Sequence, residues 1–188
     1  MDMMHRIQVA DGRAVLIRRA LHGDEPSIQG FVQGLSAQSR YQRFLHPLRE
    51  VTQSMLQDMV QPDEVHGTTL LALAGVADLE VVGLAQFDVV EPGHAEVAVI
   101  VDEGWRRVGL ATRLLRALET ASVAVGIAEA HADILRENPA ALMLARQMGC
   151  VVDATSGDLY TLHVTKRMTL PSTNLQRSLE ERGLLNPG

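Results

Sequence analysis

The sequence predicts an α/β (α+β) protein in which a mixed, mostly antiparallel sheet of about seven strands is flanked by helices. Apolar runs of strand length alternate with turn residues, and other stretches repeat their apolar residues with a helical period. The chain has 188 residues, 46% of them hydrophobic, so it can bury one core of ordinary size. We expect one domain over residues 1–168 and a polar tail over 169–188, in which the pattern Thr173 to Gln176 predicts one short helix.

The first predicted elements are one strand and two helices. An apolar run covers residues 14–18, and Asp24 is the expected N-cap of the next helix, with Pro26 in its first turn. A second helix is expected after Thr52. The first helix carries one apolar stripe, formed by Ile28, Phe31, Val32 and Leu35.

Three strands are expected next, and the chain then alternates between helix and strand. The strands at 67–74, 80–90 and 94–102 are joined by short breaks, which favours an antiparallel meander. After Trp105 the apolar period becomes helical, and residues 111–124 contain no proline or glycine. The remaining elements are a strand at 127–135, a helix that Asn138 caps and Gly149 ends, and terminal strands at 150–153 and 158–167.

The composition narrows the classes of partner and compartment. A formal charge of −6 gives no support for general attraction to nucleic acid or to an anionic membrane. The single cysteine, Cys150, excludes an internal disulfide and any multi-cysteine metal site, and no other metal motif is present. The N-terminus lacks the apolar region of a secretory signal. We therefore expect a cytoplasmic protein without a metal, and the sequence leaves a homodimer open.

The segment with the clearest chemistry runs from the strand at 94–102 through a tight loop directly into a helix. Gly109 and Ala111 are small, so a ligand can approach the backbone there. Free N–H groups and the positive end of the helix dipole favour a phosphate or pyrophosphate. The loop lacks the Gly-Lys-Ser/Thr of a Walker A motif. The alternative is a tight turn that merely exposes two arginines.

Residues 106–111, Arg-Arg-Val-Gly-Leu-Ala, match the R/Q-x-x-G-x-G/A motif of the GNAT superfamily of N-acetyltransferases. The order of elements from Ala14 to Met168 also resembles the GNAT fold. Within the superfamily the chain most resembles the acetyltransferase domain of bacterial Pat-type protein lysine acetyltransferases. The segments that carry this finer resemblance are residues 39–44, 95–99 and 136–141.

The resemblance implies that acetyl-CoA is the cosubstrate and lies in a V-shaped notch between the fourth and fifth strands. It assigns Val99, Ile100 and Val101 to the pantetheine arm and Asn138 to a later cofactor contact. It places Arg106 at the mouth of the site. The pyrophosphate would be surrounded by the backbone of Arg107, Val108, Gly109, Leu110, Ala111 and Thr112.

Glu96 is the candidate catalytic residue. An amine must be neutral before it attacks a thioester, so a general base has to remove a proton. Glu96 shares a strand face with Ala98 and Ile100, and a carboxylate in an apolar setting is a stronger base near neutral pH. Pat-type domains, which the chain resembles, have a catalytic glutamate at this position. The alternative is a glutamate at the solvated start of a strand.

One position departs from the family pattern. Many GNAT enzymes have a tyrosine four residues before the glycine that ends the last helix, where it protonates the leaving thiolate, and this chain has Ala145 there. The Pat-type domains resemble the chain in lacking this tyrosine. Water could protonate the thiolate, or the protein could bind CoA without turnover.

The expected function is acetyl-CoA-dependent N-acetyl transfer to a primary amine by direct attack in a ternary complex, with a protein lysine as the favoured acceptor. The segment from Ser39 to Phe44 is expected to be helical and to bring Arg40, Tyr41 and Arg43 near the acceptor groove. The alternative is that Tyr41 and Phe44 pack in the core. A small-molecule amine N-acetyltransferase and a non-catalytic CoA-binding regulatory module are the competing functions.

Overall fold

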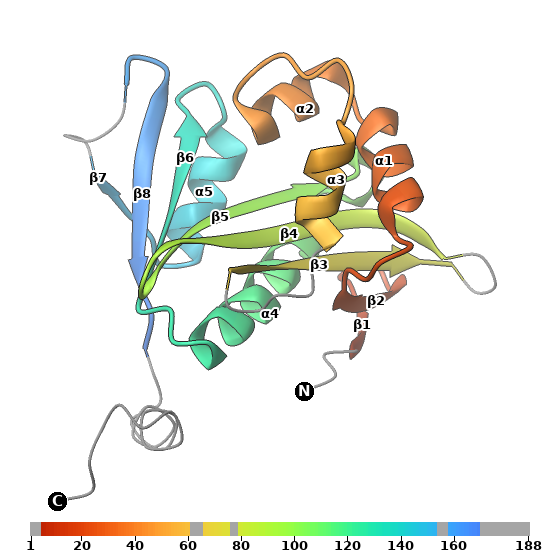
Figure 1. The fold of residues 1–188 in the computed structure, drawn as a ribbon, viewed down its shortest axis with the longest axis horizontal. Coiled ribbons are helices and arrows are strands. Elements are labelled where there is room, and N and C mark those ends of the chain that lie inside the picture. Colours follow the sequence, from red (N-terminus) through yellow and green to blue (C-terminus); the bar gives the residue numbers. More distant parts are fainter. Residues whose placement is uncertain (1–4, 61–65, 76–78, 154–157, 170–188) are drawn as a thin grey trace, which may run out of the picture.

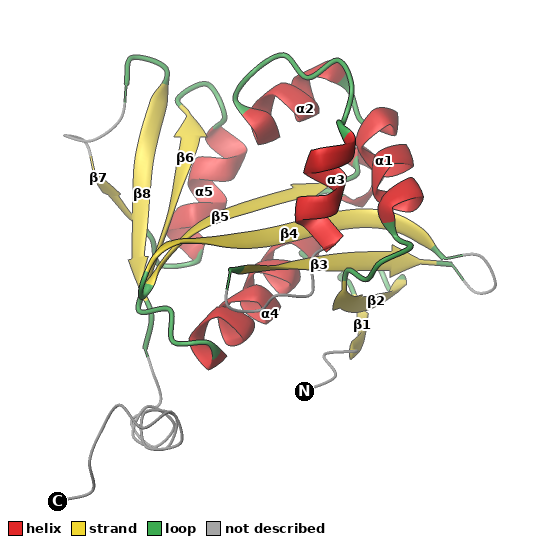
Figure 2. Ribbon diagram, in the orientation of Figure 1, coloured by secondary structure: helices red, strands yellow, loops and turns green. Residues whose placement is uncertain are grey.

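The computed structural model describes residues 5–60, 66–75, 79–153 and 158–169, and its main feature is an eight-stranded sheet with helices on both faces (Figures 1 and 2). The short helix expected in the tail lies outside the described residues. The strands are β1 (His5–Gln8), β2 (Ala14–Arg19), β3 (Gly67–Ala74), β4 (Glu80–Glu91), β5 (His94–Val101), β6 (Glu129–Leu135), β7 (Val151–Asp153) and β8 (Thr161–Arg167). The helices are α1 (Glu25–Gly34), α2 (Ala37–Phe44), α3 (Gln53–Val60), α4 (Leu110–Ala124) and α5 (Pro139–Gln147), with one 3₁₀ turn, η1 (Glu103–Trp105).

The sheet is mixed and mostly antiparallel, as the sequence predicts. Its spatial order is β1-β2-β3-β4-β5-β6-β8-β7, so the last strand of the chain lies between β6 and β7. Only β5 and β6 pair in parallel; the other described neighbours are antiparallel. The helix α4 forms the crossover between these two parallel strands, as a parallel connection requires.

Two apolar clusters hold the helices on the two faces of the sheet. On one face, α4 buries a stripe at helical spacing, Leu110, Leu114 and Leu118, against β3, β4 and β5. On the other face, α1 and α3 pack on apolar residues of β3, β4 and β5, among them Leu84 and Ile100. Because side chains alternate along a strand, the residues that share a face with Leu84 and Ile100 are also on the α1–α3 side.

The strand β1 was not expected from the sequence, and the helical segment Ser39 to Phe44 was not expected to form a separate helix. The strand β1 is an edge strand whose residues are exposed apart from the half-buried Ile7, so it has no apolar alternation to detect. The helix α2 adds a third helix before β3. It is polar along most of its length, and Ser36 begins it by accepting a hydrogen bond from the Ser39 N–H at 3.1 Å.

The role expected for Asp24 needs a correction. Asp24 is the N-cap residue of α1, but its side chain makes no capping hydrogen bond. Its carboxylate instead accepts two hydrogen bonds from Arg18, at 2.6 and 2.8 Å, and one from the Leu21 N–H at 2.8 Å. A charged partner on the neighbouring strand therefore competes successfully with the helix terminus.

Two further features bear on function. In the part of the chain that the structure describes, no helix is long and apolar enough to cross a membrane, and no group of three or more His, Cys, Asp or Glu side chains is placed to hold a metal.

The ammonium of Lys166, on β8, donates a hydrogen bond to Glu119, on α4, at 2.8 Å.

Candidate active site

The strands β5 and β6 pair over only three residues and then separate. Their partners are His94 with Glu129, Ala95 with Ala130, and Glu96 with His131. Figure 1 shows the two strands side by side at one end and splayed apart at the other. The remainder of β5 stays paired with β4, up to Val101 opposite Gly83. We call this separation the fork; it lies between the fourth and fifth expected strands, where the notch was predicted.

A glycine on β4 lets α4 approach the open end of the fork. A Cβ placed on Gly83 would lie 3.0 Å from Cδ1 of Leu114, so a larger residue there would crowd the Leu114 side chain of α4. Gly83 is also the partner of Val101, the last residue of β5. The N-terminus of α4 is thereby held next to the end of β5.

The residues of β5 assigned to the pantetheine arm lie along the open edge of this strand. The side chains of Ile100 and Val101 are buried on opposite faces of the sheet, and Val99 packs against the α4 cluster. Their side chains thus pack in the core. What they can offer to a ligand in the fork is mainly backbone N–H and C=O.

The loop before α4 contains two residues with left-handed backbone. Arg107 has φ of 61° and Gly109 has φ of 84°. This conformation is uncommon for a residue with a side chain and turns successive N–H groups toward a common concave side, a geometry that binds anions. Asp102 supports the start of the loop by accepting a hydrogen bond from the Gly104 N–H at 2.8 Å.

The N-terminus of α4 is not capped by a side chain. Gly109 is the N-cap residue, and the first helical hydrogen bond runs from the Arg113 N–H to the Gly109 carbonyl at 3.1 Å. The N–H groups of Leu110, Ala111 and Thr112 therefore have no acceptor within the helix. The Leu110 side chain is buried in the core, so only its backbone can reach a ligand.

The hairpin of β1 and β2 clamps this loop. The Ala10 N–H donates to the Val108 carbonyl at 3.0 Å, and Arg13 donates to the Gly104 carbonyl at 3.0 Å. The Arg13 guanidinium also lies 3.7 Å from the centre of the Trp105 ring. Trp105 packs against the α4-side core, so its ring anchors the loop. The clamp itself was not foreseen, because it joins segments far apart in sequence.

Arg106 turns toward α2. Its guanidinium donates to Ser39 Oγ at 2.7 Å and lies 3.4 Å from Glu103 Oε1. Glu103 also accepts hydrogen bonds from the Ser39 hydroxyl and from the Ser36 N–H. Burial would raise the pKa of Glu103, but these hydrogen bonds prevail and lower it to about 2. The loop and the start of α2 are thus joined by a charged network.

Glu96 lies at the vertex of the fork. It is the last residue of β5 that pairs with β6, and it shares the α1–α3 face with Ile100. Its side chain is exposed and makes no hydrogen bond or ion pair with the described residues. The expectation of an apolar setting is therefore wrong. Alternation along a strand fixes the face of a side chain but not what covers it.

Three polar residues lie beside Glu96: Arg43, Gln86 and Asp88. None of them was placed there from the sequence alone. Arg43 of α2 donates to Gln86 Oε1 at 3.1 Å, and Gln86 Nε2 donates to Asp88 Oδ1 at 3.0 Å. Asp88 is the partner of Glu96 in the β4–β5 register. A signal was present, because Gln86 and Asp88 interrupt an apolar strand two residues apart and so share one face. Their meeting with Arg43 required the tertiary structure.

The charges of this group perturb one another. Burial lowers the pKa of the Arg43 guanidinium, and the carboxylates of Asp88 and Glu96 oppose that shift. Desolvation raises the pKa of Asp88, and the charges of Glu96 and Asp58 raise it further, against the hydrogen bond from Gln86 and the charge of Arg43. Asp88 nevertheless remains exposed to solvent.

The last helix carries the other two positions discussed from the sequence. Asn138 caps α5, since its Oδ1 accepts a hydrogen bond from the Ala141 N–H at 3.1 Å. Ala145 is half-buried within α5.

Next to the fork, His131 lies with its ring centroid 5.2 Å from that of His163, and His163 Nδ1 is 2.9 Å from Asp133 Oδ1.

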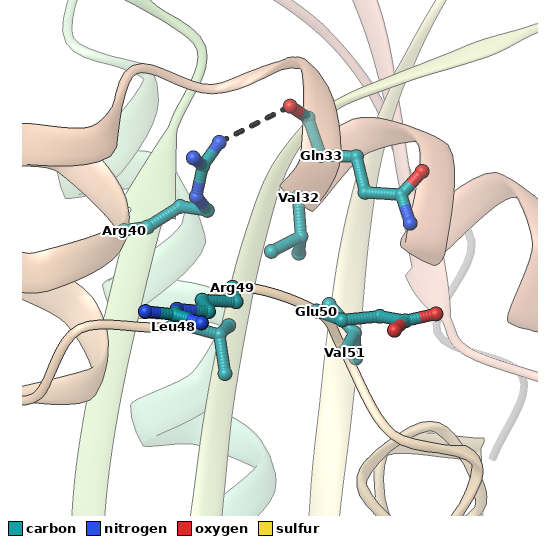
Figure 3. A pocket seen from close by; sticks show the side chains of 7 residues that line it. All are labelled: Val32, Gln33, Arg40, Leu48, Arg49, Glu50 and Val51. Atoms are coloured by element: carbon teal, nitrogen blue, oxygen red, sulfur yellow. Dashed lines mark hydrogen bonds between the residues drawn. The ribbon is translucent and has the colours of Figure 1, made fainter.

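A small pocket lies away from the fork, between α1 and the segment that joins α2 to α3 (Figure 3). Arg40 borders it and donates to the Gln33 carbonyl at 3.2 Å, near the end of α1. Arg40 therefore links two helices, whereas Arg43, one turn later, reaches the sheet. The pocket lining is Val32, Gln33, Arg40, Leu48, Arg49, Glu50 and Val51.

Comparisons with solved structures agree on the fold. The GNAT domain of S. lividans PAT superposes with a TM-score of 0.80 at 20% identity, over 87% of this chain and 96% of that chain. A spermidine N-acetyltransferase from Vibrio cholerae, in complex with CoA and spermine, superposes with a TM-score of 0.65 at 15% identity, over 83% of this chain and 96% of that one.

Comparisons by sequence give the family. A curated relative, acetyltransferase PA5475 of Pseudomonas aeruginosa, is 30% identical over 110 residues, which cover 57% of this chain and 59% of the relative. The chain thus matches less than two thirds of that relative's length. The family model described as "Acetyltransferase (GNAT) family" matches residues 32–150, a span that contains the fork, the loop and α4. On this evidence the chain belongs to the GNAT acetyltransferase family.

Proposed function

We propose that the protein is an acetyl-CoA-dependent N-acetyltransferase that transfers the acetyl group to a primary amine by direct attack in a ternary complex. The observation that carries the proposal is the position of Glu96 at the vertex of the fork. A free carboxylate at one end of the open β5 edge and an anion-binding helix terminus at the other suit a thioester with a phosphate-bearing tail. A cytoplasmic location belongs to the same proposal.

The residues around the fork fit acetyl-CoA as a substrate. The open edge of β5 at Val99, Ile100 and Val101 would hydrogen-bond the pantetheine arm, and the N–H groups of residues 107–112 would surround the pyrophosphate. The V. cholerae enzyme of similar fold was solved with CoA. Asn138 would keep its capping bond and present its remaining surface to the cosubstrate. Arg106 would have to leave Ser39 to reach a phosphate, so we assign it a secondary role.

Glu96 would act as the general base. Its carboxylate accepts a proton from the acceptor ammonium, and the freed nitrogen lone pair attacks the thioester carbonyl carbon. The C–N bond forms, the C–S bond breaks, and CoA leaves as a thiolate. Ala145 has no proton to give, so water protonates the thiolate.

A protein lysine is the favoured acceptor. The similarity to the GNAT domain of S. lividans PAT, with its TM-score of 0.80, supports it, as do the exposed carboxylates at the vertex. A small polyamine is the second candidate, because a spermidine N-acetyltransferase shares the fold. The ratio of kcat/KM for a lysine-bearing protein to that for free polyamines and aminoglycosides decides between them. A small amine preferred by more than about tenfold, some 1.4 kcal/mol, would overturn the lysine assignment.

The non-catalytic alternative rests on Ala145. The test is the release of free thiol from acetyl-CoA by the purified protein, measured against lysine-bearing proteins, polyamines and aminoglycosides. We expect release that depends on one class of amine. Binding of acetyl-CoA, seen as a rise in melting temperature, without release for any amine would favour a CoA-binding regulatory module.

A further inference from the structure

A polar strip formed by Arg43, Gln86, Asp88 and Glu96 lies on the α1–α3 side of the sheet, beside the vertex of the fork. It crosses from α2 to β4 and on to β5. The general-base role uses only Glu96. Arg43 and Gln86 are linked to Asp88 by a chain of hydrogen bonds that the base role does not explain.

Asp88 is held in place by a buried amide. Gln86 is only 6% exposed, and both ends of its side-chain amide are used, one by Arg43 and one by Asp88. Burial of an amide is unfavourable unless it is hydrogen-bonded, so this arrangement is specific rather than incidental. Its effect is to fix one oxygen of a carboxylate that solvent can still reach.

The two carboxylates of the strip face each other without a direct counter-charge. Asp88 and Glu96 are register partners on neighbouring antiparallel strands, so their side chains share one face, and like charges in that position repel. Arg43 donates to Gln86 rather than to either carboxylate, and its Nε is buried without a hydrogen-bond partner among the described residues. The strip therefore has one negative charge in excess, which a cation would neutralise.

We propose that Asp88 binds the ammonium group of the acceptor amine and positions it beside Glu96. This inference rests on the proposed function. A carboxylate fixed by Gln86 can accept one N–H of the ammonium with its second oxygen, while Glu96, opposite it, faces another N–H. The ligand class is a primary ammonium, because its three N–H groups allow it to donate to both carboxylates on this face of the sheet at once.

The two carboxylates have different roles in the transfer of protons. Glu96 takes the first proton, and the neutral nitrogen attacks the thioester carbon. The second proton leaves the nitrogen as the tetrahedral intermediate collapses, and through water it reaches the thiolate of CoA. Asp88 takes up neither proton and keeps the nitrogen in line, so its loss should weaken acceptor binding more than it slows the chemical step.

The test compares Asp88→Asn and Asp88→Glu with Glu80→Gln, which removes one exposed carboxylate from the far end of the same strand. The probe is the amine of the panel with the highest kcat/KM. For Asp88→Asn we expect the KM for the amine to rise at least tenfold, a smaller change in kcat, and the wild-type acetyl-CoA thermal shift. Asp88→Glu should recover most of the amine affinity, and Glu80→Gln should leave both constants unchanged. Asp88→Ser serves as a second neutral variant if Asp88→Asn does not fold.

The outcomes separate this inference from the proposed function. An unchanged amine KM in Asp88→Asn, while Glu96→Gln loses activity, would overturn the role of Asp88 and leave the acetyltransferase intact. An equal loss in Asp88→Asn and Asp88→Glu, or a loss of the acetyl-CoA shift, would show a structural role and overturn it as well. If the wild-type protein binds acetyl-CoA but acetylates no amine, both proposals fail.

Discussion

Glu96 and His131 are the last pair of residues that join β5 to β6. Beyond them the only parallel pair in the described sheet separates, and the backbone of β5 loses one of its two neighbours. The candidate catalytic residue, Glu96, thus lies at the point where the backbone groups on one edge of β5 lose their partners in β6. A ligand that formed hydrogen bonds along the open edge of β5 would therefore end beside this carboxylate.

Glu96→Gln should abolish most turnover while leaving the fold and the cosubstrate site intact. A general base contributes roughly 10²–10⁴-fold to a rate. We expect a decrease in that range in acetyl-CoA-dependent thiol release, with an unchanged acetyl-CoA thermal shift. The matched control is Glu129→Gln on β6, which pairs with His94 at the closed end of the same three-residue ladder. Near-native turnover of Glu96→Gln, with chemistry rate-limiting, would place the base elsewhere.

Gly109→Glu should abolish acetyl-CoA binding. A Cβ at this position meets no atom within 4 Å, so the protein leaves room for the start of a side chain, but the charge of the glutamate would repel the phosphates at the start of α4. The positive φ of Gly109 adds strain of about 1–3 kcal/mol. Gly126→Glu is the control, because Gly126, just beyond α4, also has a positive φ and open space around it. A thermal shift retained in Gly109→Glu would contradict the cosubstrate assignment.

Arg13→Ala should weaken acetyl-CoA binding although Arg13 is not expected to touch the ligand. The substitution removes the hydrogen bond to the Gly104 carbonyl and the contact with Trp105, and so loosens the loop. A loss of 1–2 kcal/mol corresponds to a roughly 5–30-fold rise in the acetyl-CoA KM. Arg13→Lys should not restore it, because an ammonium lacks the planar stacking surface. If the acetyl-CoA KM is unchanged in both variants, the clamp does not support the site.

Asp24→Asn should destabilise the fold in a pH-dependent way. Burial opposes ionisation of Asp24, but its hydrogen bonds with Arg18 and the Leu21 N–H prevail and lower its pKa. Its stabilising effect is present above the unfolded pKa of about 3.9 and disappears as pH falls through the lower folded value. At neutral pH we expect a loss of about 1–3 kcal/mol in unfolding free energy, since the pair is partly buried.

The check is denaturant unfolding of both proteins from neutral pH to about pH 3. The difference between wild type and Asp24→Asn should shrink toward acid. Asp11→Asn, in the exposed pair with Arg13, is the control and should change stability little. A difference that stays constant over this pH range would mean that the charge of Asp24 is not what stabilises α1.

Periodicity was sufficient for most of the fold. The three strands of the meander and the helix α4 were predicted within a few residues, because each has an apolar face buried against the sheet. The helix α5 was located by its cap residues, Asn138 and Gly149, and none of its own residues is buried. The strand β1 was missed because only Ile7 is even half-buried. The helix α2 was missed as a separate element because its sequence is polar, and contacts with Gln86 and Glu103 rather than an apolar stripe hold it in place.

The site was predictable only where the backbone determines it. The strand, the loop and the uncapped start of α4 follow from a local motif, and the fork appears at the expected strands. The surroundings of Glu96 depend on register. Asp88 lies opposite Glu96 because an irregularity between Val89 and Glu91 shifts the register that the turn sets by one residue. Arg43 comes from α2, more than forty residues earlier in the chain. No local pattern contains that information.

Lys166 is the one lysine in the whole sequence, and Glu119 holds its ammonium. If the protein acetylates lysines, it offers almost no target to itself. An acetyl-lysine signal from a reaction mixture would then report the added acceptor with very little background. Lys166→Arg would keep a cation opposite Glu119 and remove the last ε-amine. Such a chain could be purified and mixed with candidate substrates, so that any ε-acetylation detected by mass comes from the substrate alone.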